Sequence, residues 1–255
     1  MDENYTIFEE FELPSKGLIY ESPINPKIRL RSMTTEDEMW RLQRTDTPYK
    51  VMSELIDKCI VGEKPGLSAY DMCLGDYQFL LHKLRTVTYG PDYKLIITCP
   101  VCKSINEVTI NLEDLGVLTY DEHTMDEAKI TLPKSKKVIE LRLQTPRMLD
   151  DIETRKRELK KKTKDKTSRF DYLLTLESLI KTVDGSVYTP AQLEAFILKL
   201  PLADANYLIQ KADKLNQKVG VETTFTATCP DCGNEVVAPF LITSEFFGPT
   251  IDDWW

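Results

Sequence analysis

The residues best suited to chemistry in this sequence are four of its six cysteines, which occur as two Cys-x-x-Cys pairs. Cys99 and Cys102 lie in TCPVCKS, and Cys229 and Cys232 lie in TCPDCGN. A Cys-x-x-Cys turn brings two sulfurs together, and as thiolates they bind Zn²⁺ at about 2.3 Å. Two such turns complete a tetrahedral site and leave no position for water, so the sequence predicts structural zinc and not catalytic zinc.

The residues around each pair predict a zinc-knuckle hairpin, in which a metal-binding turn joins two strands. Strand-like runs precede and follow both pairs, at residues 93–98, 105–112, 222–228 and 234–242. A thioredoxin-like redox pair would instead begin a helix in a βαβ unit. Disulfide pairing of the same cysteines is a second alternative.

The two pairs are unusually far apart in the chain. Between Cys102 and Cys229 lie 126 residues, whereas the two pairs of a zinc ribbon are separated by roughly 15–20 residues. A shared zinc would therefore join distant segments, and its loss should loosen the whole chain. The other two cysteines, Cys59 and Cys73, lie in apolar helical contexts and are expected in the core.

No convincing catalytic set accompanies the cysteines. The two histidines, His82 in a helix and His123 in a linker, are not near a serine or cysteine motif. The glycine-rich phosphate-binding motifs and the HExxH zinc motif are missing from the sequence. We therefore expect no enzymatic activity.

The elements that must position the cysteines follow the same plan twice along the chain. Three segments recur in order, namely 26–42 with 137–153, 53–62 with 177–186, and 74–90 with 200–216. Capping signals mark four helix starts, at Thr35 with Glu38, Ser68, Thr145 with Pro146, and Thr189 with Pro190 and Gln192. Each half thus reads as a strand, helices and a Cys-Pro-x-Cys hairpin.

The repeat predicts an α+β fold of two pseudo-symmetric halves, each with a strand, a hairpin and short helices, joined by a four-cysteine zinc-knuckle pair. The first half spans residues 1–118, the second half 119–243, and an aromatic and acidic tail 244–255. The alternative is two independent halves, each with an incomplete metal site.

A basic insert, residues 155–169, is present only in the second half. It carries nine basic and two acidic residues, so its local charge of +7 leaves about −15 on the rest of a chain of net charge −8. As a helix it would be solvated on nearly all sides. Such a segment contacts solvent alone, an acidic protein partner or nucleic acid, and Lys160, Lys161 and Lys162 are its candidate contact residues.

The tail, SEFFGPTIDDWW, places four aromatic residues among acidic ones. Phe246, Phe247, Trp254 and Trp255 are candidate partner-binding residues, because exposed aromatic side chains anchor protein interfaces. The alternative is that the tail folds back on its own chain.

The overall composition is that of a folded protein without a membrane span. Hydrophobic residues make up 42% and charged residues 29% of the 255 residues. The start is acidic, unlike a secretory signal, and no apolar run reaches the roughly 18 residues of a membrane span. We expect a soluble, cytoplasmic protein whose net charge of −8 disfavours nucleic acid as a partner.

Several motifs resemble one known family. LPSKGLIY, IRLRSMTTEDE, YGPDYKLIITCPVCKSINEVTINL and TCPDCG are similar to the T-even-type bacteriophage base plate protein family, most densely over residues 11–118. The resemblance implies a non-enzymatic baseplate hub protein of contractile-tailed phages, made in the host bacterial cytoplasm. Members are either subunits of the virion or assembly factors, and their partners are other hub and tail proteins.

Two other functions compete with a hub role. One is a zinc-ribbon-like regulator that binds nucleic acid through the basic insert, and the other is a thiol oxidoreductase. For the hub role, zinc would set the angle between the halves and so present a rigid docking surface.

Overall fold

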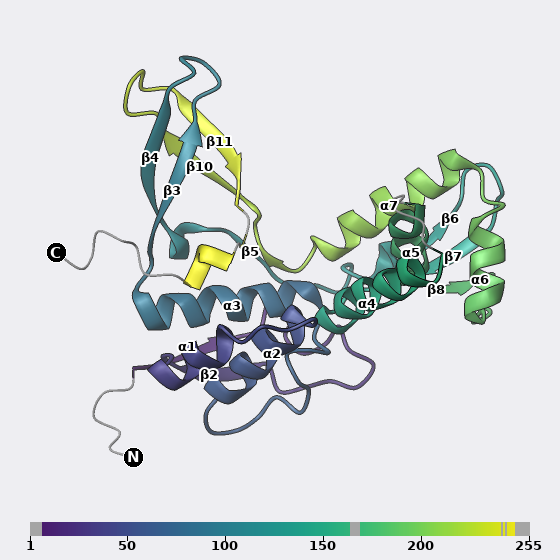
Figure 1. Cartoon of the computed structure of the whole chain (residues 1–255), viewed down its shortest axis with the longest axis horizontal. Coiled ribbons are helices and arrows are strands. Elements are labelled where there is room, and N and C mark those ends of the chain that lie inside the picture. The colour runs from purple at the N-terminus through teal and green to yellow at the C-terminus, as the bar shows by residue number, and fades with distance from the viewer. Residues whose placement is uncertain (1–6, 164–168, 241, 243, 248–255) are drawn as a thin grey trace.

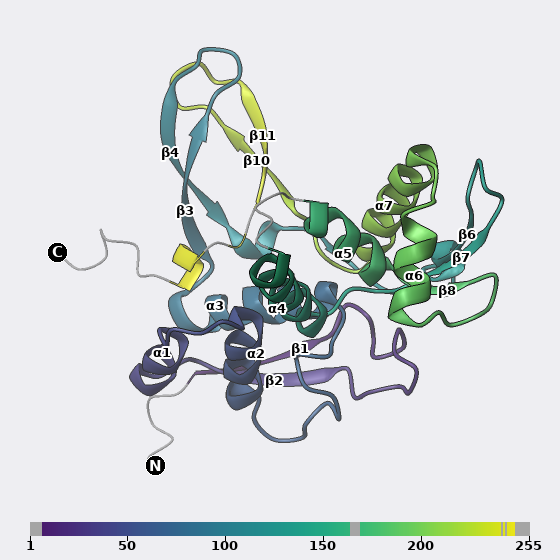
Figure 2. The same cartoon turned by 45° about the vertical axis from the view of Figure 1, so that its right-hand side comes forward.

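The computed structural model describes residues 7–163, 169–240, 242 and 244–247. Two helical bodies carry a pair of β-hairpins that project side by side from the molecule (Figure 1, Figure 2). Helices and small antiparallel sheets alternate along the chain, which confirms the predicted α+β class.

The first body consists of β1 (Phe8–Glu12), β2 (Lys27–Arg31), α1 (Thr35–Arg41), α2 (Pro48–Cys59) and α3 (Leu74–Tyr89). β1 and β2 pair antiparallel, and Leu30 of β2 also bridges Ile60 directly after α2. Successive residues of a strand point to opposite faces. Ile28 and Leu30 are therefore buried together, while Lys27 and Arg29 are exposed.

The second body consists of β6 (Lys129–Thr131), β7 (Val138–Leu141), α4 (Pro146–Thr163), α5 (Arg169–Leu179), β8 (Ile180–Val183), α6 (Pro190–Ile197) and α7 (Leu202–Asn216). Its three strands form an antiparallel sheet in the order β6-β7-β8. Leu141 of β7 pairs with Ile180, much as Leu30 pairs with Ile60 in the first body.

The two hairpins are β3 (Asp92–Thr98) with β4 (Ile105–Asn111), and β10 (Thr224–Thr228) with β11 (Glu235–Pro239). These are the four strands predicted around the cysteine pairs. The short strands β5 (Val117–Leu118) and β9 (Gly220–Val221) pair below them, and three 3₁₀ turns span Leu112–Asp114, Asp126–Ala128 and Ser244–Phe247.

Packing groups the elements differently from the order of the sequence. One hydrophobic cluster joins the first body to both hairpins and to Phe246 and Phe247. The other contains residues of the second body and the 3₁₀ turn before it. The hairpin that closes the second half of the sequence therefore packs with the first body.

A buried aspartate anchors a loop in each body. Asp76 of α3 accepts hydrogen bonds from the backbone N–H and hydroxyl of Ser15, at 3.0 and 2.5 Å. Asp204 of α7 accepts from the backbone N–H groups of Lys134 and Ser135, both at 2.7 Å. Both anchored loops begin with Leu-Pro, and both carboxylates are fully buried.

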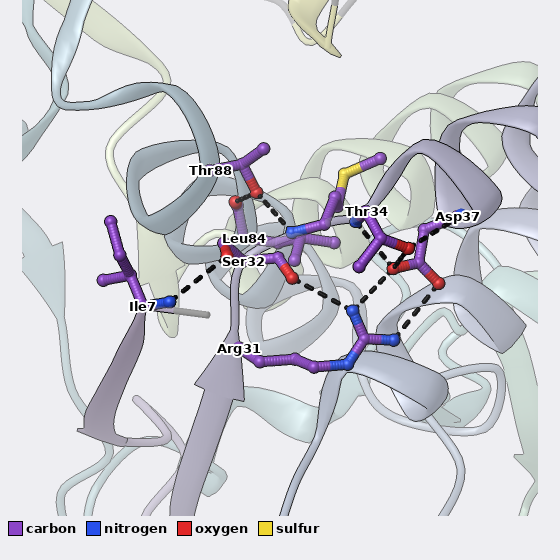
Figure 3. Close-up of polar contacts among 8 residues, drawn as sticks. Ile7, Arg31, Ser32, Thr34, Asp37, Leu84 and Thr88 are labelled. Atoms are coloured by element: carbon purple, nitrogen blue, oxygen red, sulfur yellow. Dashed lines mark hydrogen bonds and ion pairs between the residues drawn. The ribbon is translucent and has the colours of Figure 1, made fainter. Parts of the chain in front are cut away.

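The start of α1 corrects one prediction. Its capping box is Thr34 with Asp37, whereas Thr35 is the first helical residue. Arg31 points at the same carboxylate and binds both oxygens of Asp37, at 2.5 and 3.2 Å (Figure 3). The Asp37 carboxylate therefore holds both Thr34 and Arg31, and this double contact favours a cap at Thr34.

Two of the other helix starts are as predicted. Thr189 forms a capping box with Gln192 at the start of α6, and the Thr145 hydroxyl accepts from the N–H of Met148 at 3.3 Å. The helix predicted at Ser68 is wrong. Residues 69–71 form a turn, in which the Ser68 hydroxyl accepts from the N–H of Tyr70, and the next helix begins at Leu74.

The two bodies meet at close, specific contacts. Asp150 of α4 is buried and accepts the N–H of Lys50 at the start of α2, at 2.8 Å. A separate close contact joins the first body to the base of the second hairpin: Gly75 of α3 lies against Gly220 of β9, where a β-carbon on Gly220 would be 2.7 Å from the Gly75 α-carbon. Larger residues at these two glycines would force α3 away from β9 and shift the base of the second hairpin.

Candidate metal centre

The four predicted cysteine ligands meet at the tips of the two hairpins. The sulfur atoms of Cys99, Cys102, Cys229 and Cys232 all lie within 4.8 Å of one another. Across the hairpins, Cys99 Sγ lies 3.7 Å from Cys232 Sγ, and Cys102 Sγ lies 3.7 Å from Cys229 Sγ. The sequence prediction that distant pairs share one site is consistent with this geometry.

The sulfur separations fit a tetrahedral metal. Four sulfurs at about 2.3 Å from zinc lie about 3.8 Å apart along the tetrahedron edges, close to the observed 3.7 Å. A disulfide requires about 2.05 Å between sulfurs, and all six cysteines are free thiols in the structure. The donor set and its spacing therefore suit Zn²⁺ or another thiolate-binding ion.

The two knuckles use the same backbone turn. The N–H of Cys99 donates to the backbone carbonyl of Ser104 at 2.9 Å, and the N–H of Lys103 donates to the backbone carbonyl of Cys99 at 3.0 Å. In the second knuckle the N–H of Cys229 donates to the carbonyl of Asn234, and the N–H of Gly233 donates to the carbonyl of Cys229, both at 2.9 Å. Lys103 and Gly233 both have positive φ, 65° and 72°, so the lysine adopts a conformation that favours glycine.

Polar side chains surround the sulfurs unequally. The Ser104 hydroxyl lies 2.9 Å from Cys102 Sγ and 3.5 Å from Cys229 Sγ, and so contacts both knuckles. Asn234 donates to Cys232 alone, at 3.2 Å. The Asn106 amide extends the bridge between the hairpins, because it donates to Ser104 at 2.8 Å and to Asp231 at 3.1 Å.

The Ser104 hydroxyl favours the thiolate form of two of the four cysteines, Cys102 and Cys229. The Ser104 hydroxyl is the main cause that lowers the pKa of Cys229 to about 6, and it also lowers the pKa of Cys102. One sulfur of each knuckle belongs to a buried residue, Cys99 or Cys229, while Cys102 and Cys232 are exposed. The site is thus half covered by the hairpins and half open at the tip.

The two remaining cysteines lie elsewhere, as predicted. Cys59 and Cys73 are buried in the first body, at 0% and 4% exposure. Burial raises the pKa of both thiols to about 12, which disfavours the reactive thiolate. His82 is buried beside Phe240 and Phe246, and His123 is exposed beside Asp126; within the described residues neither histidine ring is hydrogen-bonded to a serine or cysteine side chain.

The basic insert extends α4, and most of its described cations form ion pairs within the chain. Arg155 pairs with Glu177 at 2.8 Å, Lys156 with Asp171 at 3.2 Å, and Arg157 with Asp46. Lys160 lies 3.9 Å from Asp171, and Lys161 is exposed. The Lys162 side chain and residues 164–168 lie outside the described residues.

The aromatic tail divides into two parts. Phe246 and Phe247 are buried, at 0% and 3% exposure, and Phe246 packs against Tyr93 and Phe240. They therefore contact the chain's own core, which is the alternative that the sequence left open. Trp254 and Trp255 lie outside the described residues.

Sequence reasoning missed the polar residues around the sulfurs. Ser104, Asn106 and Asn234 carry no ligand motif, and the sequence shows only that a serine or asparagine stands two residues after the second cysteine of each pair. That shared position is the signal that could have identified Ser104 and Asn234. The role of Asn106 depends on the placement of Asp231, 125 residues away.

Comparisons with known proteins place the chain in one family. No curated protein and no solved structure matches it. Among the described residues, none of the helices is long and apolar enough to cross a membrane. The family model described as T4 bacteriophage base plate protein matches residues 6–248, nearly the whole chain, and the protein therefore belongs to the T4 bacteriophage base plate protein family.

Proposed function

We propose that this protein is a non-enzymatic component or assembly factor of the phage baseplate hub, in which structural zinc joins two distant hairpins. The observation that carries the proposal is the convergence of four cysteine sulfurs from two knuckles in a chain of the base plate family. Its binding partners would be other hub and tail proteins. It would act in the host bacterial cytoplasm during assembly. If it stays attached to the finished baseplate, it is also part of the virion.

Cys99, Cys102, Cys229 and Cys232 would hold the metal, which would supply a cross-link between the thiolates of the two knuckles. Ser104 and Asn106 connect the two hairpin tips by hydrogen bonds. Phe225, Phe240 and Phe246 hold the hairpin bases against α3. With both ends held, the hairpin pair is a stiff projection, which suits a docking element.

A structural role fits the donor set better than catalysis. Four thiolates fill a tetrahedral shell, so a metal held by them keeps no position for a substrate or water. The thiol chemistry that an oxidoreductase needs also competes with metal binding at the same sulfurs.

We also propose that the two halves arose from one duplicated unit. The repeated Leu-Pro loops, the aspartates Asp76 and Asp204 that bind them, and the equal knuckle turns support this. These matched contacts occur at equivalent points of both halves, 128 residues apart for the aspartates and 130 for the cysteines. The pseudo-twofold arrangement of the halves is part of the same proposal.

The test combines metal analysis with capture of partners. The purified chain should hold one zinc, and in an extract of infected cells it should retain tail and baseplate proteins. Cys229→Ser with Cys232→Ser should lose the metal and weaken capture, whereas Val187→Ser, at an exposed position on the second body, should do neither. Full capture without metal would contradict the role of the zinc cross-link.

The nucleic-acid alternative makes an opposite prediction. A regulator would bind DNA or RNA with an affinity that falls steeply with salt and is lost when Lys160, Lys161 and Lys162 are neutralised. The ion pairs of α4 already compensate much of its charge, which favours a protein partner. Salt-dependent binding lost in the triple variant would reverse this preference.

A further inference from the structure

Two surfaces meet where the two bodies contact each other. One is the α3 turn, residues 70–74 directly before α3, and the other is the α4 corner, residues 144–150, where β7 leads into α4. The N–H of Leu74 donates to the carbonyl of Gln144 at 3.0 Å. The start of α3 is thereby fixed on the corner of the second body.

Two pairs of side chains complete this contact. Arg147 of the α4 corner binds both carboxylate oxygens of Asp71 in the α3 turn, at 2.5 and 2.8 Å. The hydroxyl of Tyr70 donates to Asp150 at 3.1 Å, and both residues are buried. The contact therefore combines a backbone hydrogen bond, an ion pair and a buried side-chain hydrogen bond.

The α3 turn has a counterpart in the second half. This α7 turn, residues 198–202 directly before α7, lies 128 residues later in the sequence. The N–H of Asp71 donates to the carbonyl of Ser68 at 2.9 Å. At the matching position the N–H of Lys199 donates to the carbonyl of Phe196 at 3.1 Å, so the two turns share a backbone hydrogen bond.

The α4 corner likewise has a counterpart in the first half. This α1 corner, residues 33–39, where β2 leads into α1, lies 111 residues earlier in the sequence. The Thr34 hydroxyl accepts from the N–H of Asp37, and the Thr145 hydroxyl accepts from the N–H of Met148. Both corners therefore start a helix with the same cap.

The two counterparts are exposed and far apart. Leu198 and Leu202 of the α7 turn are 69% and 67% exposed, and Met39 of the α1 corner is 69% exposed. In both views α1 and the connection from α6 to α7 lie at opposite ends of the molecule (Figure 1, Figure 2). The contact made between the bodies by the α3 turn and the α4 corner is thus not repeated by their counterparts within one chain.

We propose that the α7 turn of one chain binds the α1 corner of a second copy, as the α3 turn binds the α4 corner within the chain. Because the two surfaces differ, the copies would join head to tail and form a ring or a filament. This inference rests on the repeat of the two halves. It is independent of the hub role, since it needs no other baseplate protein.

The first support is a reversal of charge at matching positions. Within the chain the corner supplies a cation, Arg147, and the turn supplies an anion, Asp71. The α1 corner has Glu36 in place of Arg147, and the α7 turn has Lys199 in place of Asp71. Glu36 and Lys199 are exposed, and neither forms an ion pair with a described residue. Both partners have changed sign, so opposite charges would meet again.

The second support is a matched change from polar to apolar residues. Met39 occupies the position of Asp150, and Leu198 occupies the position of Tyr70. A change on one side alone would leave a buried polar group without its partner, which is costly. Here both positions are apolar, so the two side chains would bury each other's surface.

The third support is a pair of backbone groups. The N–H of Leu202 corresponds to that of Leu74, and the carbonyl of Met33 corresponds to that of Gln144. Neither the Leu202 N–H nor the Met33 carbonyl makes a hydrogen bond in the part of the chain that the structure describes. A bond between them would reproduce the backbone link of the internal contact.

Sedimentation velocity of the full, metal-loaded chain tests the association. Its mean mass should rise above the 29.4 kDa of one chain as concentration increases. Lys199→Glu and Glu36→Lys each bring like charges together, so each should weaken association by at least about tenfold. Lys214→Glu makes the same change at an exposed lysine of α7 and should leave association unchanged.

Mixing the two charge variants tests the pairing itself. Lys199→Glu and Glu36→Lys should each stay dissociated alone but associate when combined, because each carries the charge that the altered surface of the other requires. Leu198→Asp should also weaken association, whereas Val187→Asp, at a similarly exposed site of the second body, should not.

Carbodiimide crosslinking needs no variant. This reagent joins an amine to a carboxylate in contact, so a mixture of isotopically heavy and ordinary chains should yield a crosslink between Lys199 of one chain and Glu36 of another.

Three results would overturn the proposal. The first is a chain that stays monomeric at all concentrations and gives no such crosslink. The second is association that Lys199→Glu and Glu36→Lys leave unchanged, which would assign it to another surface. The third is a mixture of these two variants that stays dissociated although each lost association alone.

Discussion

Helices α3 and α7 have matching places in the two halves, yet their surroundings differ. Each carries a buried aspartate at its third residue and leads to a cysteine hairpin. α3 buries most of its residues between Gly75 and Val87, whereas α7 exposes Gln210, which corresponds to His82. Phe240 and Phe246 cover α3 at His82. The same local plan therefore gives a central helix in one half and a surface helix in the other.

The matched aspartates show the difference at the level of single atoms. Burial raises the pKa of Asp76, which accepts hydrogen bonds from the hydroxyls of Ser15 and Tyr20 as well as one N–H. Burial also acts to raise the pKa of Asp204, but the N–H groups of Ser135 and Lys134 hold it below the ordinary value. At equivalent positions, Asp76 is thus bound mainly by hydroxyl groups and Asp204 by backbone N–H groups.

The largest expected effect tests whether the two knuckles are equal. Cys99→Ser with Cys102→Ser and Cys229→Ser with Cys232→Ser should each abolish tight metal binding, because each pair supplies two of four thiolates. We expect a loss of several kcal/mol in the free energy of unfolding, since structural zinc contributes on this scale. Metal analysis and denaturant unfolding, with Val101→Ser as the control, measure both effects. If either double variant still binds one metal ion per chain, the other knuckle is sufficient by itself and the two knuckles are not equal.

The next prediction compares buried His82 of α3 with Gln210, its exposed counterpart on α7. Burial lowers the pKa of His82 to about 4, whereas histidine in an unfolded chain titrates near 6.5. Between these values the unfolded chain binds more protons, so stability falls as pH falls, by about 3 kcal/mol in total. His82→Leu should remove this part of the pH profile. Gln210→His should add no comparable slope, and a slope of equal size there would contradict the difference in burial.

The aspartates predict a smaller but asymmetric effect. In Asp204→Asn the amide NH₂ must face a backbone N–H, because both oxygens accept from backbone donors. We expect a cost of about 2 kcal/mol. In Asp76→Asn the NH₂ can donate to the rotatable hydroxyls of Ser15 and Tyr20, so the cost should be below about 1 kcal/mol. Thermal unfolding of both variants measures the difference, and equal costs would contradict it.

The smallest effect concerns the polar contacts of the sulfurs. Ser104→Ala removes a contact to both knuckles, so we expect about a tenfold loss of metal affinity, at the low end for such outer partners. Asn234→Ala removes a contact to Cys232 alone and should weaken binding less. Chelator competition with each variant measures the affinities. A larger loss for Asn234→Ala would reverse the proposed order.

Local signals predicted the hairpins and two of the four helix starts, because these depend on residues close together in the chain. The cap of α1 was displaced by one residue, since the pairing of Arg31 with Asp37 favours Thr34 over Thr35. The stretch after Ser68 forms a turn, where Asp57 of α2 binds the Ser68 hydroxyl and the N–H of Ala69.

The sequence by itself determined the two cysteine pairs, the spacing within each pair and the strands beside them. Only the tertiary structure decided which hairpin packs on which body, that Phe246 and Phe247 are buried, and that α4 neutralises much of its charge internally. The physical reason is range. Turn geometry, capping and side-chain alternation act over a few residues, whereas burial and ion pairing depend on contacts between separate elements, some of them more than a hundred residues apart.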